Sequence, residues 1–442
     1  MKVYLYLKLT LAILLVSFVN ILNAQTYCIA DRFRQVDYFP PSDILVYLNV
    51  MYGSATDWND NEVALLADVY MPDPVIDPLE QRPLIVMVHS GSWQGGSKSK
   101  MEADARYYAG LGYVVAPIDY RIGWDWDNAN PACTGDSLSY AKARHRAIQD
   151  LRAALRYFSH HAGDLGVDPS HIFLYGGSAG AGVIMETQFL TPAEFESLFG
   201  ADLVNELGGA DASGNAYTDT YTIVGSHTSS PSMTDTSFIG PEDTIPGIYF
   251  HGTADQLVLY TEGARGGCTN QEYGYMFGSR RITEQLAQFG VCYELNSEIG
   301  APHGALYTAS YRNSHTACFF KNILCENCLT NEFEQSLAPC VLSPPQGVFQ
   351  KAGARELLPP KLSVFPNPAK EILHLSITAS EGEEITLLLS NPLGQISWQR
   401  NLPKPVSGTF EETIDLKDFP AGIYLLTLEQ GASTQAKKIV IK

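Results

Sequence analysis

The sequence predicts an α/β fold with a mostly parallel twisted sheet, followed by a small C-terminal all-β sandwich domain. Between residues 62 and 328, short apolar runs rich in β-branched residues alternate with amphipathic helical segments, which is typical of a parallel sheet covered on both faces. Residues 361–442 alternate apolar and polar positions between turn signals, which is typical of a sandwich. The stretch 342–360 between these regions is rich in Pro, Gly and Gln and indicates a linker.

The composition is that of a folded, acidic protein. Of 442 residues, 45% are hydrophobic and 11% are aromatic, which are ordinary values for globular domains and argue against disorder. The formal net charge is −19. Because binding to nucleic acid or to an anionic membrane surface needs clustered Lys and Arg, neither is expected as a partner.

The first 24 residues, 1–24, have the pattern of a secretory signal peptide. Lys2 and Lys8 accompany a mostly apolar run over residues 9–19, and we expect cleavage after Ala24. A membrane anchor is the alternative, but a spanning helix needs about 20 apolar residues and this run is shorter. We therefore expect a secreted or cell-surface protein that passes through the periplasm and has no membrane span after signal removal.

The cysteines agree with an oxidising destination, because all of them follow the signal peptide. They are Cys28, Cys133, Cys268, Cys292, Cys318, Cys325, Cys328 and Cys340. Disulfides are therefore expected, with the pairing left open among about 105 possibilities. Cys325 and Cys328 have the spacing of a metal or redox pair, but no second pair or spaced histidines lie nearby, so no metal site is predicted.

The α/β domain is expected over residues 25–341. Its strands are predicted from short apolar runs, several of them continuous as in buried parallel strands, at residues 64–70, 84–89, 113–119, 172–175, 221–225, 247–251 and 291–297. Apolar residues at helical spacing predict helices over residues 140–160 and 272–289.

The strongest chemical signal is the segment 176–180, G-G-S-A-G, which lies between the predicted strand 172–175 and a helical segment. A G-x-S-x-G sequence in this context is a nucleophile elbow, in which a sharp turn projects the serine Oγ from the sheet. Flanking glycines let the backbones approach without a Cβ clash. A small-residue turn with an incidental serine is the alternative. We interpret Ser178 as the nucleophile.

A triad acid and base follow Ser178 in the expected chain order. Asp255 closes the strand 247–251 in the segment H-G-T-A-D, and it would hold the imidazole in the correct tautomer. Glu262 and Asp243 are possible substitutes that close a strand less cleanly. His303 lies in a loop after the strand 291–297 and is the expected base, whereas His315 falls inside a predicted last helix.

The order of these motifs resembles the α/β-hydrolase superfamily over roughly residues 62–328. Residues 89–93, H-S-G-S-W, resemble the H-G-G-G-W loop of its hormone-sensitive-lipase-like and feruloyl-esterase-like branches. The resemblance implies an oxyanion hole made by the backbone N–H groups of Ala179, Gly91 and Ser92. His89 is expected to brace this loop rather than to transfer protons.

The resemblance implies a serine carboxylic ester hydrolase that acts by two-step acyl transfer on an ester substrate, with no cofactor and no metal. Alternatives within the fold are a serine peptidase or amidase, a lipase and a polyester depolymerase. An inactive surface-binding module is the alternative outside enzymes, and an intact triad argues against it.

The sequence says little about the substrate. Trp93, Trp124 and Trp126 are predicted to rim the active-site face and to contact the substrate. Residues 191–219 are expected to form a lid, and its apolar face is interrupted by acidic residues. Because a lipase lid needs a continuous apolar face, we expect short-chain acyl esters or aromatic-acid esters as substrates.

The tail, residues 361–442, resembles the C-terminal sorting domain of proteins exported by the type IX secretion system of Bacteroidota. The resemblance rests on V-F-P-N-P-A at residues 364–369, A-G-I-Y at 421–424 and the closing K-K-I-V-I-K. It implies the type IX secretion machinery as a partner. The alternative is a carbohydrate-binding or adhesive module, which would usually expose a row of aromatic residues, whereas Trp398 is the only tryptophan of the tail.

Overall fold

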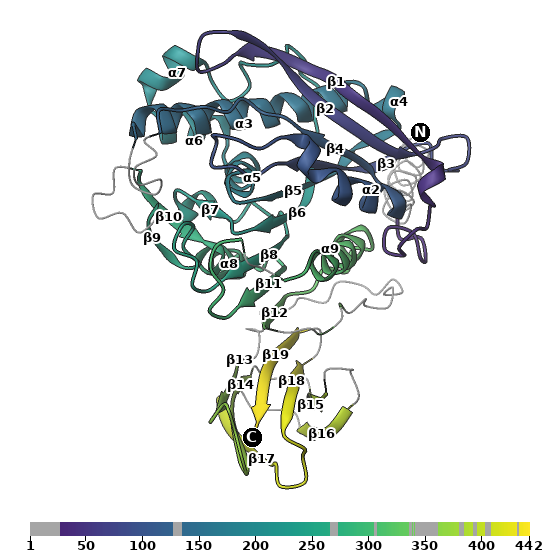
Figure 1. Ribbon diagram of the computed structural model, residues 1–442, viewed down its shortest axis with the longest axis vertical. Helices are drawn as coiled ribbons and strands as arrows, with labels where there is room; N and C mark the ends of the chain where they lie inside the picture. Colours follow the sequence, from purple (N-terminus) through teal and green to yellow (C-terminus); the bar gives the residue numbers. More distant parts are fainter. Residues whose placement is uncertain are drawn as a thin grey trace, which may run out of the picture.

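The computed structural model describes residues 27–126, 135–265, 273–304, 307–335, 338, 340, 361–379, 384–391, 396–402, 408–430 and 433–442. The signal peptide predicted over residues 1–24 and the linker predicted over residues 342–360 lie outside these described residues. The protein has a large α/β body with a smaller β-sandwich below it (Figure 1).

One sheet runs through both parts of the protein. Within the described residues it holds 13 strands, and those from β4 to β19 pair in parallel. Their order is β1 (Ile44–Thr56), β2 (Glu62–Pro72), β4 (Val114–Ile118), β3 (Arg82–Val88), β5 (Val167–Gly177), β6 (Ile223–Ser229), β8 (Gly247–Gly252), β11 (Tyr293–Glu298), β12 (Asn331–Glu334), β19 (Ser433–Ile441), β18 (Gly422–Gln430), β15 (Ile385–Ser390) and β16 (Ile396–Leu402).

Helices cover both faces of the parallel region. Because side chains alternate along a strand, β3 sends Leu84 and Val86 to one core cluster and Ile85 and Met87 to another. The first face is covered by α3 (Ser137–His160) and α5 (Ala179–Phe189), with α8 (Ser279–Gln288) beside them. The second face is covered by α2 (Glu102–Leu111) and α9 (Ala309–Leu324). This three-layer arrangement is the predicted α/β fold.

The predicted strands and helices are found near their expected places, with three main differences. Strand β1 was not predicted, because several large apolar side chains such as Tyr47, Leu48 and Met51 are exposed and blur the alternation. The helix predicted over residues 272–289 is too long, since Tyr275–Gly278 is a short strand and α8 begins at Ser279. The sequence Asn331–Glu334 is too polar to have indicated strand β12.

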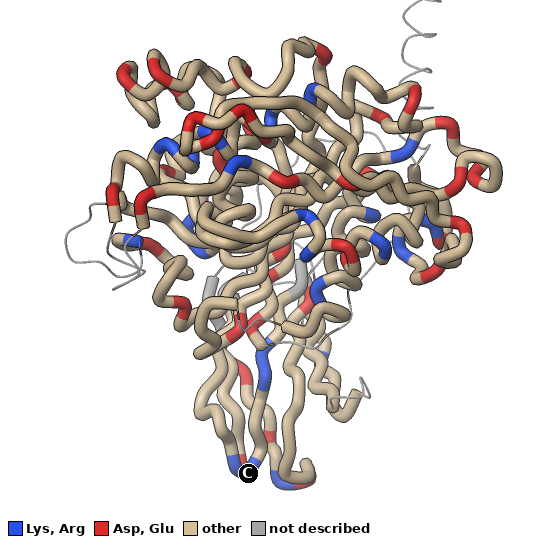
Figure 2. The backbone as a smooth tube through the Cα atoms, turned by 45° about the horizontal axis from the view of Figure 1, so that its top comes forward, with Lys and Arg blue, Asp and Glu red and all other residues tan. Residues whose placement is uncertain are grey.

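The remaining elements are short. They are η1 (Pro41–Asp43), η2 (Lys98–Met101), α4 (Ala162–Leu165), α6 (Pro192–Phe199), α7 (Ala201–Leu207) and η3 (Thr236–Phe238), with a small sheet of β7 (Ser232–Met233), β10 (Tyr275–Gly278) and β9 (Glu262–Ala264). Among the described residues, no helix combines the length and the apolar character needed to cross a membrane. Acidic residues are spread widely over the α/β body (Figure 2).

The tail is a sandwich of two sheets. Strands β13 (Lys361–Phe365), β14 (Ile372–Ala379) and β17 (Gly408–Asp415) face the sheet that contains β15, β16, β18 and β19. The two sheets enclose a core of their own, with Leu375, Ile377, Leu387, Leu426 and Leu428 fully buried. This is the C-terminal all-β sandwich that the sequence predicts.

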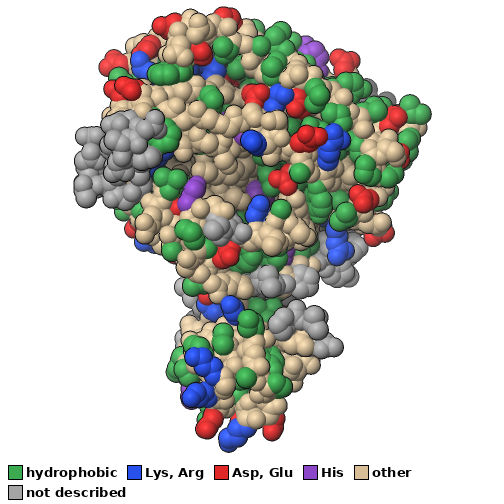
Figure 3. Space-filling model, in the orientation of Figure 1, with side chains coloured by type: hydrophobic (Ala, Val, Ile, Leu, Met, Phe, Trp, Pro, Cys, Tyr) green, Lys and Arg blue, Asp and Glu red, His purple; other side chains and the backbone are tan. Residues whose placement is uncertain are grey.

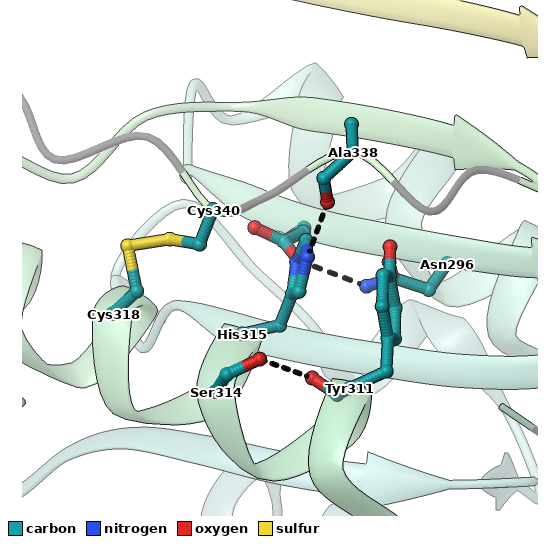
Figure 4. Close-up of a disulfide and its surroundings, with 8 residues drawn as sticks. Asn296, Tyr311, Ser314, His315, Cys318, Ala338 and Cys340 are labelled. Carbon is teal, nitrogen blue, oxygen red and sulfur yellow. Dashed lines mark hydrogen bonds and ion pairs between the residues drawn. A yellow bond between two sulfur atoms is a disulfide. The ribbon is translucent and has the colours of Figure 1, made fainter. Parts of the chain in front are cut away.

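Three disulfides are found among the described cysteines, in agreement with the expected oxidising compartment. They join Cys28 to Cys325, Cys292 to Cys328 and Cys318 to Cys340. Cys325 and Cys328 therefore bind separate partners. Figure 4 shows the Cys318–Cys340 bridge, which ties α9 to the segment after β12. Cys133 and Cys268 lie outside the described residues.

A buried ion cluster anchors the N-terminal segment to the sheet. Asp77 receives hydrogen bonds from both terminal nitrogens of Arg32 at 2.6 Å and from Arg82 Nε at 2.5 Å. All three side chains are almost completely buried. Burial alone would raise the pKa of Asp77, but the hydrogen bonds from Arg32 and Arg82 outweigh it and lower the pKa.

We expect Asp77→Asn to destabilise the protein by about 3 to 5 kcal/mol, because it leaves two buried guanidinium groups without a countercharge. Urea unfolding at pH 7 measures this loss, with Glu102→Gln in an exposed ion pair as the control, expected below about 1 kcal/mol. Because the pKa of Asp77 is lowered on folding, its contribution is present above pH ~4 and is lost as the pH falls below that value. Equal effects of the two substitutions at pH 7 would contradict this account.

Candidate active site

The nucleophile candidate Ser178 lies in a sharp turn between β5 and α5. Its backbone has φ 50° and ψ −119°, a conformation that L-residues rarely adopt. The turn is held by a hydrogen bond of 2.8 Å from the N–H of Ser178 to the carbonyl of Ser229. At Gly180, an added Cβ would lie 2.2 Å from the carbonyl oxygen of Val88, so only glycine lets α5 approach β3 this closely.

The three predicted triad residues lie together at the carboxyl ends of the parallel strands. Ser178 Oγ lies 3.0 Å from His303 Nε2, and His303 Nδ1 lies 2.7 Å from Asp255 Oδ2. These distances are hydrogen-bonding distances, and they connect residues that follow β5, β8 and β11. The arrangement can pass the proton of the serine hydroxyl to the imidazole while the carboxylate holds the ring.

Asp255 is held as a carboxylate. It is 3% exposed, and its Oδ1 accepts hydrogen bonds of 2.9 Å from the N–H groups of Leu257 and Val258. Although burial favours the neutral acid, hydrogen bonds from His251, His303 and Val258 lower the pKa of Asp255. A carboxylate at this position favours the His303 tautomer with its proton on Nδ1, which leaves Nε2 able to accept the proton of Ser178.

His251 is a partner of this carboxylate that the sequence reasoning did not single out. Its Nε2 lies 3.4 Å from Asp255 Oδ2 and 2.9 Å from the carbonyl oxygen of Val258, while its Nδ1 lies 2.7 Å from Ser279 Oγ. The ring is completely buried. The only signal was its place at the start of the H-G-T-A-D segment, four residues before Asp255.

The loop after β3 has an unusual backbone. Gly91, Ser92 and Trp93 all have positive φ, at 131°, 54° and 59°. A Cβ on Gly91 would lie 2.1 Å from the carbonyl oxygen of Gly95. Ser90 Oγ donates a hydrogen bond of 2.8 Å to the carbonyl oxygen of Gly177, which fixes the loop beside the elbow.

The predicted oxyanion donors are available for a ligand. Within the described residues, the N–H groups of Gly91, Ser92 and Ala179 donate to no other protein atom. Gly91 and Ser92 line the same cavity as Ser178. His89 braces the loop: its ring stacks on Tyr120 at 4.2 Å, and burial lowers its pKa, which keeps it neutral.

Ser178 and His303 open into a cavity of about 510 Å³. Figure 3 shows a hollow in the middle of the α/β body with histidine and Lys or Arg side chains around it. Most of the lining residues have polar side chains or are glycines, and the lining comprises His89, Ser90, Gly91, Ser92, Gly96, Lys100, Met101, Asp104, Tyr175, Gly176, Gly177, Ser178, His227, Ser229, Ser230, Leu257, His303, Gly304 and Arg312.

None of the three tryptophans predicted to rim the active-site face is among the described residues that line the cavity of Ser178. Trp93 and Trp124 are 7% and 2% exposed, and they pack in the core beside α3 instead of lining the cavity. Trp126 stacks on Trp124 at 6.0 Å and also lies outside the cavity lining. The large indole surfaces gain more from burial than from exposure. Trp124 holds the Gly91–Ser92 loop from the core side, because its Nε1 donates a hydrogen bond of 3.0 Å to the carbonyl oxygen of Ser92.

The structure does not place the predicted lid, residues 191–219, at the cavity of Ser178. No residue of this segment lines the cavity of Ser178, and the segment packs on α3 instead. Gln149 Nε2 donates to the carbonyl oxygen of Leu207 at 2.8 Å, and Arg152 pairs with Asp211 at 2.8 Å. Asp211 is therefore a partner for Arg152 and Arg156 of α3, whereas Glu194 accepts hydrogen bonds from Thr191 at the start of α6.

The alternative acid and base candidates have other partners. His315 is buried on α9, with Nδ1 2.6 Å from Glu294 and Nε2 2.9 Å from the carbonyl oxygen of Ala338 (Figure 4). Burial alone would lower the pKa of His315, but Glu294 raises it. Glu262 pairs with Arg281, and Asp243 accepts a hydrogen bond from the N–H of Gly240.

Comparisons with known proteins agree with this architecture. Residues 67–187 match the family model BD-FAE, and residues 363–442 match the family model described as a secretion system C-terminal sorting domain. Carboxylesterase NlhH of Mycobacterium tuberculosis is 34% identical over 116 residues, 26% of this chain and 30% of that protein. Carboxylesterase 3B of Mus musculus is 30% identical over 132 residues, 30% of this chain and 21% of that protein.

The chain therefore spans less than a third of the length of these two relatives. Among solved structures, esterase 2 of Thermogutta terrifontis phosphorylated by paraoxon is 22% identical, with a TM-score of 0.42 over 64% of this chain and 92% of that chain. Residues 67–187 are thus similar to the BD-FAE family and residues 363–442 to secretion system sorting domains, and the second match indicates a secreted or cell-surface protein.

Proposed function

We propose that the protein is a secreted serine carboxylic ester hydrolase. The observation that carries this proposal is the continuous chain of hydrogen-bonding distances from Ser178 Oγ through His303 to Asp255, in a cavity that also holds the Gly91–Ser92 loop. The names of the two carboxylesterase relatives support the same reaction class.

The geometry supports a two-step acyl transfer. His303 Nε2 takes the proton of Ser178 as Oγ attacks the ester carbonyl, and the N–H groups of Ala179, Gly91 and Ser92 stabilise the oxyanion. His303 then gives that proton to the departing alkoxide, which leaves an acyl-enzyme. A water molecule attacks the acyl group by the same route and releases the acid. In each step Asp255 stays ionised and stabilises the imidazolium.

The alternatives are weaker on specific grounds. A serine peptidase or amidase would use the same triad, but the relatives named above are carboxylesterases. A lipase needs an apolar acyl groove, whereas Met101 and Leu257 are the only large aliphatic side chains among the described residues that line the cavity. A polyester depolymerase would share the triad and differ only in substrate. An inactive surface-binding module would not need a buried carboxylate to orient His303.

We expect Ser178→Ala to lower kcat/KM on p-nitrophenyl acetate by about 10⁴-fold, because loss of a triad member leaves only the oxyanion hole and binding. Hydrolysis is followed with the purified full chain, and circular dichroism checks that the fold is unchanged. Ser314→Ala, at an exposed serine of α9, is the matched control. Activity of Ser178→Ala within tenfold of the parent would refute the nucleophile assignment.

The tail and the α/β body have separate hydrophobic cores, so we propose that the tail serves export rather than catalysis. Removing residues 361–442 should leave kcat/KM within about threefold, because no tail residue lines the cavity. In the native host the truncated protein should stay inside the cell envelope. Immunoblots of medium, surface and periplasm measure this, and external truncated protein would contradict the proposal.

We expect short acyl chains to be preferred. Each methylene gains about 0.8 kcal/mol only where it leaves water for an apolar wall, and few of the described side chains that line the cavity are aliphatic. The kcat/KM on p-nitrophenyl esters should therefore be highest from acetyl to butyryl and fall steeply by dodecanoyl. Methyl ferulate tests the aromatic-acid alternative. Rates that rise from butyryl to palmitoyl, with activation at an oil interface, would indicate a lipase.

A further inference from the structure

Two basic side chains from different elements line the cavity of Ser178. Lys100 comes from η2 and is exposed, and Arg312 comes from the first turns of α9 and is half-buried. Within the described part of the chain, neither forms an ion pair with an Asp or Glu. Arg312 is held in place by a hydrogen bond to the carbonyl oxygen of Tyr307. The cavity thus contains two cations that form no ion pair with a described carboxylate.

Among the described residues that line the cavity, Asp104 is the single carboxylate against the two cations Lys100 and Arg312. Asp104 Oδ1 accepts a hydrogen bond of 2.7 Å from Asn313 Nδ2, and Oδ2 accepts one of 3.2 Å from the hydroxyl of Tyr175. Two histidines of the lining, His89 and His227, add no charge near neutral pH, because burial lowers the pKa of both. Arg312 lowers the pKa of His227 further. The lining therefore keeps an excess of positive charge.

A buried hydroxyl adds to this polar region. Ser230 is 2% exposed and lines the cavity, yet its Oγ has no hydrogen-bond partner within the described residues. Buried polar atoms normally find a partner, so an unpartnered hydroxyl on a cavity wall suits a ligand oxygen. The neighbouring Ser229 Oγ is already bonded to His227 Nε2 at 3.1 Å.

We infer that the ester substrate carries a carboxylate in addition to the scissile ester, and that Lys100 and Arg312 bind this carboxylate. This inference rests on the proposed function. Its substrate class is an ester with a free acid group, either a half-ester of a dicarboxylic acid or an ester whose alcohol part bears the acid. The protein as a whole has a formal net charge of −19 and repels anions, so a local pair of cations is needed to admit one.

The test compares charged and neutral esters of matched shape with the purified full chain. Mono-p-nitrophenyl glutarate against p-nitrophenyl pentanoate places the charge on the acyl side. 4-Acetoxybenzoate against its methyl ester places the charge on the alcohol side. In one of these pairs the parent should favour the charged ester by about tenfold in kcat/KM at low salt, mainly through KM, and high salt should reduce this preference.

Substitutions of Lys100 and Arg312 test whether these two residues cause the preference for the charged ester. Lys100→Gln and Arg312→Gln should each lower the charged-to-neutral ratio by about threefold, and the double variant should bring it to about one or below. Arg312→Lys should retain part of the preference. Arg281→Gln, which removes a cation of α8 outside the cavity, should leave the ratio unchanged. Because Lys100 is exposed, its variant remains informative if Arg312→Gln fails to fold.

The outcomes separate this inference from the proposed function. Hydrolysis of the neutral esters with no preference for either charged ester would overturn the inference and leave the proposed function standing. A preference that survives the Lys100→Gln substitution undiminished, and the double substitution wherever that variant folds, would also overturn it. Failure to hydrolyse any of the four esters would remove the proposed function, and the inference with it.

Discussion

The candidate site depends on the close approach of α5 to the end of β3. The turn at Ser178 has φ 50°, which is costly for a residue with a side chain, and it persists only because the surrounding structure imposes it. Gly180 permits this approach, since a Cβ there would collide with the carbonyl oxygens of Val88 and His89. The same packing brings the Gly91–Ser92 loop beside the elbow, through the hydrogen bond from Ser90 to Gly177. The proposed nucleophile and the proposed oxyanion donors are therefore positioned together by the packing of α5 against β3.

The second requirement is a carboxylate that remains ionised although it is buried. Asp255 achieves this with two backbone N–H groups on Oδ1 and two imidazoles near Oδ2. Such saturation explains why the hydrogen bonds overcome the desolvation that would otherwise raise its pKa. His251 contributes by holding the carboxylate rather than by meeting the substrate, since it is fully buried and lies outside the cavity lining.

Short sequence patterns predict those parts of the candidate site whose geometry depends on a few neighbouring residues. The elbow around Ser178 and the strand ends before Asp255 and His303 can be recognised within a few residues, and the parallel sheet brings such ends to one edge. The tryptophans and the 191–219 segment were misjudged, because burial depends on what the rest of the chain packs against them. Lys100 and Arg312 could not be paired from the sequence, since only the packing of η2 and α9 around the cavity brings them into one lining.

The α/β body and the tail are joined through strand β12, which lies between a strand of the body and a strand of the tail. Strand β12 pairs with β11 on one side and with β19 of the tail on the other, over four residue pairs and with an ion pair between Glu334 and Lys437. Without β19, β12 would be an edge strand with unpaired backbone groups. It is short and carries Glu332 and Glu334, and short charged edges resist pairing with other chains. The polar sequence of β12 is the reason why its pattern does not predict a strand. The same polar sequence suits a strand that β19 covers in the full chain and that becomes an edge strand when the tail is removed.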